Sequence, residues 1–352
     1  MSGKSAAVLA ALGLACIGLG SAAPGAAAAG QAPTFTVPAE VKQHADLAYL
    51  LAEGAVSKDH LGALLHGISY DPRVTPDPMT LRRRALAVTQ VKAFDQLYYF
   101  GMNTVGSWAL NTPDGIIQFD TLDNTEEAQR IIEGGMRANS LDPARIKYIV
   151  VMHSHADHYG GARYLQDKYK ARVLMSPADW DVVGRPAARP DAVAPPRRDI
   201  EVTDGQKLTL GGTTVTLYIT PGHTPGTMSA LIPVTDRGRP HLLSMFGGTG
   251  MPRSLGPTPV TAGVTAYRQS LERFTRISLA ANVDGVVNSH PFVDGTIEKA
   301  VLAKARKRGD PNPWLVDRGT YLRFMVSWIE AMEAAEAAFH AGTVLNTGPG
   351  GD

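Results

Sequence analysis

The segment "VVMHSHADHYGGARYL", residues 150–165, places three histidines and an aspartate within the six positions from 153 to 158. These residues follow an apolar run, and a packed core would reject them because each polar side chain needs a partner once it leaves water. A metal ion is the obvious partner. Residues two apart in an extended segment point the same way, so His153 and His155 can face one ion while Asp157 and His158 turn toward a second.

Two later segments carry histidines in a similar setting. In "TPGHTPGT", residues 220–227, His223 follows the predicted strand "VTLYIT" and lies between two turns that contain proline. In "VVNSHPF", residues 286–292, His290 also follows an apolar strand. His223 offers a third nitrogen to the first ion and His290 a third ligand to the second. The sequence therefore predicts a site at which several strands end.

Composition limits the class of partner. The chain has 352 residues, of which 44% are hydrophobic, so it can bury a substantial core. Its 34 basic and 33 acidic residues leave a formal charge of +1, which gives no basic field for nucleic acid. We therefore expect a small-molecule substrate and no nucleic-acid partner. The chain contains no Rossmann fingerprint and no recognisable serine nucleophile that would compete with metal chemistry.

The first thirty residues resemble a secretory signal. Lys4 precedes an apolar run from about residue 6 to residue 20, and small residues suited to cleavage follow. The run is shorter than the ~20 apolar residues that a membrane span needs. We expect residues 1–30 to be removed, which leaves a periplasmic or secreted protein without a membrane span. Cys16 lies inside this segment, so the mature chain would have no thiolate ligand.

The rest of the chain divides into three regions by sequence pattern. Residues 31–87 form a partly helical N-terminal extension, residues 88–300 alternate short strands with helices, and residues 301–352 form a C-terminal helical extension and tail. The proline-rich segment 184–199 is predicted to be a surface loop that could border a site. The predicted strands are 115–122, 148–155, 172–177, 207–220 with a Gly-Gly turn, and 241–248; the predicted helices are 38–55, 125–138, 160–170, 262–281 and 319–342. Such alternation indicates an α/β fold of stacked sheets covered by helices.

The segments "HSHADH", "PGHTPGT" and "SHP" together resemble the metallo-β-lactamase superfamily, over about residues 90–300. The resemblance implies an αββα sandwich with the site along one edge of its two sheets. It also implies that each chain binds two Zn²⁺ ions. His153, His155 and His223 would bind the first zinc, and Asp157, His158 and His290 would bind the second.

One segment departs from part of that family. Glyoxalase II and many lactonases of this fold carry a metal-bridging aspartate in a "GDT" segment, whereas this chain has "FGGTGMP" at residues 246–252. Some metallo-β-lactamases have a cysteine ligand there, but this chain has Thr249. The remaining pattern, with three ligands at each site, is most similar to the third subclass of metallo-β-lactamases, which are also exported.

The predicted chemistry is hydrolysis by a zinc-bound hydroxide. Zinc lowers the pKa of its bound water to about 7, so hydroxide can attack a carbonyl carbon at neutral pH. Asp157 is the predicted catalytic residue, because it could orient that hydroxide besides ligating. The preferred substrate is a β-lactam or a related cyclic amide. The alternatives are a lactone, ester or thioester hydrolase, an alkylsulfatase, a one-iron persulfide dioxygenase, and a metal-binding scaffold without turnover.

Several other polar and aromatic residues have weaker signals. Asp120 in "IIQFDT" could orient a metal ligand or cap a turn. Trp108 and Tyr159 could line the pocket, although aromatic residues beside strands more often belong to the core. No motif surrounds the remaining histidines, which we interpret as structural or exposed: His44, His60, His66, His241 and His340.

Overall fold

The structure is a computed structural model that describes residues 36–53, 61, 64–65, 87–186, 190–252 and 260–342. The predicted signal segment lies outside these residues, as do His60, His66 and the end of the chain from residue 343. The described residues from 37 onward form one compact unit. The boundaries that the sequence suggests at residues 87 and 300 stay predictions.

The first sheet has seven strands, which lie side by side in chain order. They are β1 (Thr89–Lys92), β2 (Leu97–Gly101), β3 (Gly106–Thr112), β4 (Gly115–Phe119), β5 (Ile146–Val150), β6 (Arg172–Met175) and β7 (Ile200–Glu201). Neighbours from β1 to β4 are antiparallel, and neighbours from β4 to β7 are parallel. The parallel strands need crossover connections, which is why helices follow β4, β5 and β6.

The second sheet has five strands in the order β12-β11-β10-β9-β8. They are β8 (Gln206–Leu210), β9 (Thr213–Ile219), β10 (Met228–Asp236), β11 (Arg239–Met245) and β12 (Gly285–Val286). Gly211 and Gly212 have φ angles of +53° and +77° in the turn between β8 and β9, which confirms the predicted Gly-Gly hairpin.

The inner faces of the two sheets enclose one apolar core. Its largest members include Trp108 of β3 and Trp314, whose rings meet edge to face with centroids 6.2 Å apart. Leu217, Ala230 and Met245 of the second sheet also belong to this core. Trp108 donates its indole N–H to the carbonyl of Asn288 at 2.8 Å, so it lies in the core and its polar atom is satisfied.

Helices cover the outer face of the first sheet. They are α4 (Thr125–Glu127), the π-helix η1 (Ala128–Glu133), α5 (Gly134–Ala138), the 3₁₀-helix η2 (Pro143–Arg145), α6 (Ala156–Tyr159), α7 (Ala162–Tyr169) and α8 (Pro177–Val183). Ile131, Met136 and Leu165 pack from this layer onto the sheet residues Ile149 and Val173. Tyr159 is partly buried against the same cluster.

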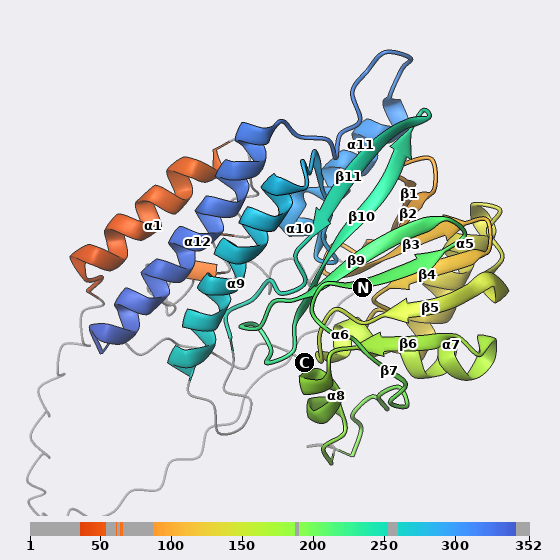
Figure 1. Ribbon diagram of the computed structural model, residues 1–352, viewed down its shortest axis with the longest axis horizontal. Coiled ribbons are helices and arrows are strands. Elements are labelled where there is room, and N and C mark those ends of the chain that lie inside the picture. The colour runs from red at the N-terminus through yellow and green to blue at the C-terminus, as the bar shows by residue number, and fades with distance from the viewer. Residues whose placement is uncertain are drawn as a thin grey trace, which may run out of the picture. The chain divides into compact units, whose positions relative to one another are not determined.

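A second helical layer covers the outer face of the other sheet. It contains α1 (Ala39–Ala52), α9 (Val260–Ala280) and α12 (Arg318–His340), whose buried side chains share one cluster with Leu231 and Phe246. The short α10 (Pro291–Asp294) and α11 (Thr296–Ala305) connect β12 to this region. Figure 1 shows α1, α9 and α12 on one side of the sheets, and α5 and α7 on the other. This order of layers confirms the predicted αββα sandwich.

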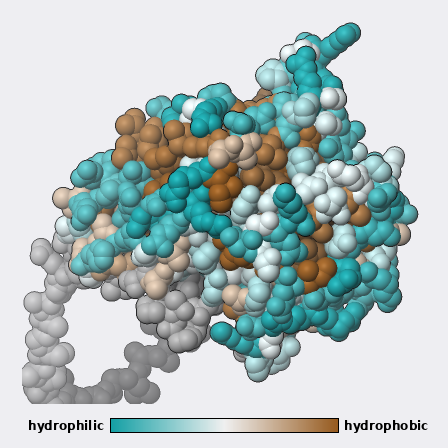
Figure 2. Space-filling model, in the orientation of Figure 1, coloured by the Kyte–Doolittle hydropathy of each residue, from teal (hydrophilic) through white to brown (hydrophobic). Residues whose placement is uncertain are grey.

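The surface of the helical layer retains some apolar side chains. Figure 2 shows apolar surface gathered over this side of the molecule, within a face that is mostly polar. Leu47 and Leu50 of α1 and Leu322 of α12 are among the exposed large apolar residues. In the described part of the chain, no helix combines the length and the hydropathy required to span a membrane.

Several elements were not predicted as such, among them the strands β1, β2, β3 and β7, and two differences are informative. Strand β10 was not predicted, and Pro233 in its middle argues against a strand by sequence alone. The pairing explains how it is tolerated, because β9 pairs only with residues 228–231 of β10 and Pro233 faces β11 alone. The predicted helix 125–138 exists, but its centre is a π-helix rather than an α-helix.

Candidate metal centre

The predicted strand 148–155 ends earlier than expected, at Val150. Beyond it, the N–H of Met152 donates to the Asp120 carboxylate at 2.8 Å, and the carbonyl of Met152 accepts from the N–H of Met228 in the second sheet at 2.8 Å. The backbone thus passes from one sheet toward the other. His153 and His155 therefore lie in a loop between the sheets, not in a strand.

The structure brings all six predicted ligands together at this edge of the sheets. His153 and His155 lie in the loop after β5, and Asp157 and His158 lie in α6, which begins directly after His155. The other two follow strands of the second sheet, as predicted: His223 lies after β9 and His290 after β12.

The first group consists of His153, His155 and His223. The Nε2 atom of His153 lies 3.2 Å from Nδ1 of His155 and 3.2 Å from Nε2 of His223. The three ring nitrogens converge on one point, and they are close enough to bind a common ion.

Backbone carbonyls determine which nitrogen of two of these rings carries the proton. His153 Nδ1 donates to the carbonyl of Gly247 at 2.9 Å, and His223 Nδ1 donates to the carbonyl of Gly250 at 2.8 Å. A carbonyl oxygen only accepts, so both Nδ1 atoms are protonated and both Nε2 atoms direct a bare lone pair into the cluster. Burial, together with the neighbouring imidazoles, holds the pKa of both rings well below the ordinary value of 6.5, so they stay neutral.

The second group consists of Asp157, His158 and His290. The Nε2 atoms of the two histidines are 3.0 Å apart, and Asp157 Oδ2 lies 3.7 Å from each of them. His290 Nδ1 donates to the carbonyl of Thr104 at 2.8 Å, which again leaves Nε2 as the bare nitrogen. The two groups adjoin, because the ring centroids of His153 and His158 are 3.8 Å apart.

Asp120 orients the second group, and it also shapes the backbone beside it. Its Oδ2 accepts from His158 Nδ1 at 2.8 Å and from the hydroxyl of Ser289. Its own backbone is left-handed, with φ of +56°, directly after β4. Of the two interpretations of Asp120 that the sequence left open, the orienting one holds, because its carboxylate accepts from His158 and from the N–H of Met152 rather than capping a turn.

Charges around the second group shift its pKa values in opposite directions. Burial lowers the pKa of His158, but the charges of Asp120 and Asp157 outweigh it and raise the pKa to about 9. Burial raises the pKa of the Asp157 carboxyl, but the imidazoles of His158 and His290 outweigh it and hold that pKa well below 3.8. The site therefore contains an ionised carboxylate next to a ring that binds a proton or a metal ion strongly.

The donor set fits two cations. The first group directs two bare lone pairs at each other across 3.2 Å, and neither ring has a proton to place between them. Such an arrangement is repulsive unless a cation binds both nitrogens. In the second group, a cation or the proton of His158 can fill the same role between the two Nε2 atoms.

The segment 246–252 supports the site through its backbone. Gly247 and Gly250 provide the two carbonyls that hold His153 and His223. At Gly248 an added Cβ would lie within 3.1 Å of the His223 ring and closer still to its Cβ, so only glycine fits there. Thr249 is buried in the same segment, which has no carboxylate.

The sequence did not predict the groups that orient the histidine rings, because these groups are far from the histidines in the sequence. The carbonyls of Thr104, Gly247 and Gly250 are backbone atoms, so no residue type announces them. The glycine pair after the histidine cluster was a usable signal. A Cβ at Gly160 would overlap the backbone of Asp123, and one at Gly161 would overlap Ala128, so the loop that carries Asp120 can pack against α6 only with glycine at both positions.

The remaining described histidines form other interactions. His44 Nδ1 lies 2.7 Å from Glu330 and 3.2 Å from Glu333, which joins α1 to α12 by partly exposed ion pairs. His241 Nδ1 lies 2.7 Å from the Asp284 carboxylate. His340 belongs to the last turn of α12.

The predicted surface loop, residues 184–199, follows α8 in the chain and contacts α7. Gln166 and Arg197 exchange two hydrogen bonds, with distances of 3.0 Å and 2.9 Å, and Arg197 also pairs with Asp167. The described parts of the segment 184–199 are therefore anchored to the helix that follows the histidine cluster.

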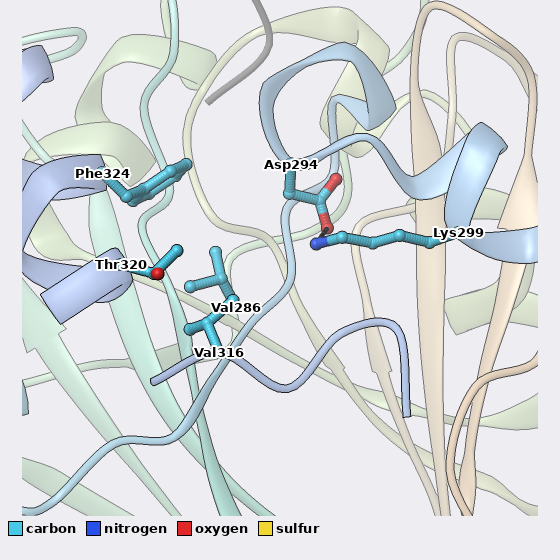
Figure 3. Close-up of a pocket in the computed structure, with 6 residues that line it drawn as sticks. All are labelled: Val286, Asp294, Lys299, Val316, Thr320 and Phe324. Atoms are coloured by element: carbon cyan, nitrogen blue, oxygen red, sulfur yellow. Dashed lines mark ion pairs between the residues drawn. The ribbon is translucent and has the colours of Figure 1, made fainter. Parts of the chain in front are cut away.

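A separate small pocket lies beyond α10, which begins directly after His290 (Figure 3). Asp294 and Lys299 point toward each other there, with 4.0 Å between Oδ2 and Nζ. Asp294 also accepts from the backbone N–H of Thr296, the first residue of α11, at 3.2 Å. The other lining residues are Val286, Val316, Thr320 and Phe324.

Comparison with known proteins agrees with this fold and site. The sequence model of the metallo-beta-lactamase superfamily matches residues 105–236, which include β3 to β10 and five of the six clustered residues. A solved subclass B3 metallo-beta-lactamase of Bradyrhizobium japonicum superposes with a TM-score of 0.62 and 26% sequence identity, over 72% of this chain and 95% of that chain. The chain shares the fold and the sequence signature of the metallo-β-lactamase superfamily. This confirms the family resemblance of the sequence motifs and its similarity to the third subclass.

Curated relatives match over shorter segments. A hydroxyacylglutathione hydrolase of Acidiphilium cryptum is 33% identical over 87 residues, which is 25% of this chain and 31% of that protein. An uncharacterized protein of Aquifex aeolicus is 28% identical over 110 residues, 30% of this chain and 49% of that protein. The chain thus spans less than half the length of either relative. Its fold and clustered histidines are those of a superfamily of metal-dependent hydrolases.

Proposed function

We propose that the protein is an exported binuclear zinc hydrolase that opens a carbonyl substrate, preferably a β-lactam or a related cyclic amide. The observation that carries the proposal is the convergence of bare imidazole lone pairs in two adjoining groups. His153, His155 and His223 would hold one zinc, and Asp157, His158 and His290 the other. When bound, zinc supplies an acidified water and polarises a carbonyl group at neutral pH.

The side chains of the site have distinct roles in this proposal. Asp157 is the member of the second group most open to solvent, with 25% side-chain exposure against 1% for His158 and 10% for His290. Its carboxylate is ionised, because the surrounding imidazoles keep its pKa low. It can therefore accept a hydrogen bond from the reacting water and orient that water toward the substrate carbonyl.

Metal analysis tests the two sites separately. We expect the purified chain to bind close to two zinc equivalents and to lose hydrolytic activity when a chelator removes them. His155→Ala should empty mainly the first site and His158→Ala mainly the second, because the two rings belong to different groups. One iron per chain, with oxygen consumption and no hydrolysis, would contradict the binuclear hydrolase.

Substrate choice requires a panel of compounds, because a site of this kind activates water against several carbonyl classes. Chromogenic β-lactam, lactone, ester, thioester and sulfate-ester substrates, together with a hydroxyacylglutathione, are offered to the zinc-loaded chain. Preference for the β-lactam supports the first choice, and preference for a lactone, ester or thioester supports the runner-up. Turnover of none of them, with two zinc ions bound, would favour a metal-binding scaffold.

Export is a separate part of the proposal, and it rests on the sequence of residues 1–30. We expect protein from the native host to begin near residues 24–31 and to be found in the periplasm or the medium. N-terminal sequencing checks this, and soluble cytoplasmic protein that still begins at Met1 or Ser2 would contradict it.

A further inference from the structure

Asp179 connects two loops of the metal centre without contacting a metal ligand. It lies near the start of α8 and is fully buried. Its Oδ2 accepts from the N–H of Ser154 at 3.0 Å and from the hydroxyl of Thr224 at 2.7 Å. Its Oδ1 accepts from the N–H of Gly226 at 2.9 Å. Ser154 separates His153 from His155, and Thr224 directly follows His223.

All three partners are donors toward Asp179. Two of them are backbone N–H groups, which cannot reverse their role. The hydroxyl of Thr224 donates to Asp179 while it shares a 2.7 Å hydrogen bond with the hydroxyl of Thr227. Only an acceptor with two oxygen atoms satisfies this set, so an amide in the same place would direct its NH₂ group at a donor.

The position of this carboxylate is fixed from several sides. The hydroxyl of Ser176 caps α8 by accepting from the N–H of Asp179 at 3.3 Å. The neighbouring Trp180 is buried and donates its indole N–H to the carbonyl of Ile200 at 3.0 Å. An added Cβ at Gly226 would overlap Ser176 and come within 2.8 Å of Cγ of Asp179, so the loop approaches the carboxylate as closely as glycine allows.

Burying this carboxylate has a cost. Desolvation raises the pKa of Asp179 to about 6, although its three hydrogen bonds act in the opposite direction. If this carboxylate only filled space, an apolar side chain could replace it without loss of stability. Instead, it accepts hydrogen bonds from donors in two separate loops.

We propose that Asp179 is a positioning residue for the first metal site, because it locks the loop of His153 and His155 against the loop of His223. The inference rests on the proposed function, since it concerns the same metal centre. The two loops would then have the same geometry before and after metal binding, so the three histidine nitrogens could bind zinc without rearrangement of the loops.

The test measures stepwise zinc affinity of the full-length chain by competition with a chromophoric chelator. Asp179→Asn should weaken the first site about 10- to 100-fold and leave the second site unchanged. The same substitution made in the His158→Ala variant, which retains only the first site, shows whether the weakened binding step belongs to that site. Asp181→Asn is the matched control, because Asp181 lies on the same helix and is exposed, with 66% side-chain exposure.

A milder variant keeps the test decisive if Asp179→Asn folds poorly. Thr224→Val removes one donor and preserves the shape of the side chain, so it should weaken the same zinc step by a smaller factor. In the Asp179→Asn/Thr224→Val double variant the two losses should be less than additive, because both remove the same contact.

The outcomes separate this inference from the proposed function. Wild-type protein that binds no zinc would overturn both. Wild-type protein that binds two zinc ions, with variants that lose both steps equally or neither, would overturn the positioning role alone and leave the binuclear site in place.

Discussion

At the scale of single residues, the metal centre depends on which nitrogen of each imidazole faces the cluster. Carbonyls of Gly247, Gly250 and Thr104 and the carboxylate of Asp120 each accept from the outward-facing Nδ1 of one ring. The three rings that donate to carbonyls are thereby held in one neutral tautomer, and all four rings direct Nε2 toward the cluster. The orientation of the rings is therefore a property of the protein and does not require the metal.

The contact between Asp120 and His158 leads to a specific prediction. Asp120→Asn keeps the left-handed backbone, which asparagine tolerates, but replaces one acceptor oxygen with an NH₂ group that faces donors. We expect the second zinc to bind about 10- to 100-fold more weakly, with a corresponding fall in hydrolysis. Zinc titration checks this. Asp114→Asn, in an exposed turn, serves as the control, and unchanged zinc affinity in Asp120→Asn would contradict the role of this carboxylate.

Thr249 provides the complementary case of a hydroxyl that we predict is not a ligand. Thr249→Ala should keep both zinc equivalents and change turnover only about 2- to 10-fold, the range of one neutral hydrogen bond. Metal analysis alongside steady-state kinetics checks the prediction. Loss of one zinc equivalent would show that the hydroxyl of Thr249 belongs to the ligand set.

At the scale of elements, the π-helix η1 places a buried carboxylate among three donors. The wider turn is visible at its end, where the N–H of Gly134 bonds to the carbonyl of Gln129, five residues earlier. Glu133 accepts from Lys168 at 2.8 Å, from Tyr169 at 2.8 Å and from Arg137 at 2.8 Å. This carboxylate therefore ties η1 to α7, the helix that follows the histidine cluster.

The Glu133 network predicts a pH dependence of stability. Burial raises the pKa of Glu133, but hydrogen bonds from Lys168 and Tyr169 outweigh it, so the net pKa lies below 4.5. A carboxyl whose pKa is depressed by folding stabilises the native state above its unfolded pKa, and this contribution disappears as the pH falls through the folded value. Glu133→Gln should therefore reduce the free energy of unfolding by about 1–3 kcal/mol at pH 7.

Denaturant unfolding of the zinc-free chain at several pH values checks this prediction. The difference between wild type and Glu133→Gln should be constant near neutral pH. It should begin to shrink below about pH 4.5, where the carboxyl of the unfolded chain takes up its proton, and should disappear as the folded carboxyl is protonated at lower pH. Glu126→Gln, exposed in the same helical segment, should show little difference at any pH. A difference that grows as the pH falls would contradict the assigned direction.

At the scale of the whole molecule, cohesion and chemistry reside in different places. The three apolar clusters lie between the sheets and under each helical layer, whereas the six clustered polar residues lie in loops and a short helix at one edge. Changes to one should therefore leave the other largely intact. Met332 of α12 is fully buried in the outer helical cluster and is suited to test this separation.

Met332→Ala should lower the free energy of unfolding by about 2–5 kcal/mol, because it opens a cavity in that cluster. Zinc content and turnover of the folded fraction should be unchanged. Urea unfolding and metal analysis of the same samples check both parts, and Leu322→Ala on the exposed face of the same helix should change stability by less than about 0.5 kcal/mol. Loss of zinc in Met332→Ala would show that the outer layer supports the site directly.

The sequence by itself determined the layered α/β class and the residues that gather at the site. Polar side chains directly after apolar strands, at His153, His223 and His290, predicted that strand ends would meet, because strand ends share an edge of a sheet. These patterns are local in the sequence, so they can be recognised without knowing the order of the strands in the sheets. The hairpin at Gly211 and Gly212 was readable for the same reason, since its turn requires left-handed backbone.

Only the tertiary structure decided how those residues are held. Asp120 reaches His158 across 38 positions, and Asp179 joins loops 25 and 45 positions away, so neither pairing has a local signature. Strand β10 tolerates Pro233 because β9 pairs only with residues 228–231 of β10, so Pro233 faces β11 alone. Backbone carbonyls complete the site, and their placement follows from packing of distant segments, which depends on free energy summed over the whole core rather than on residue type.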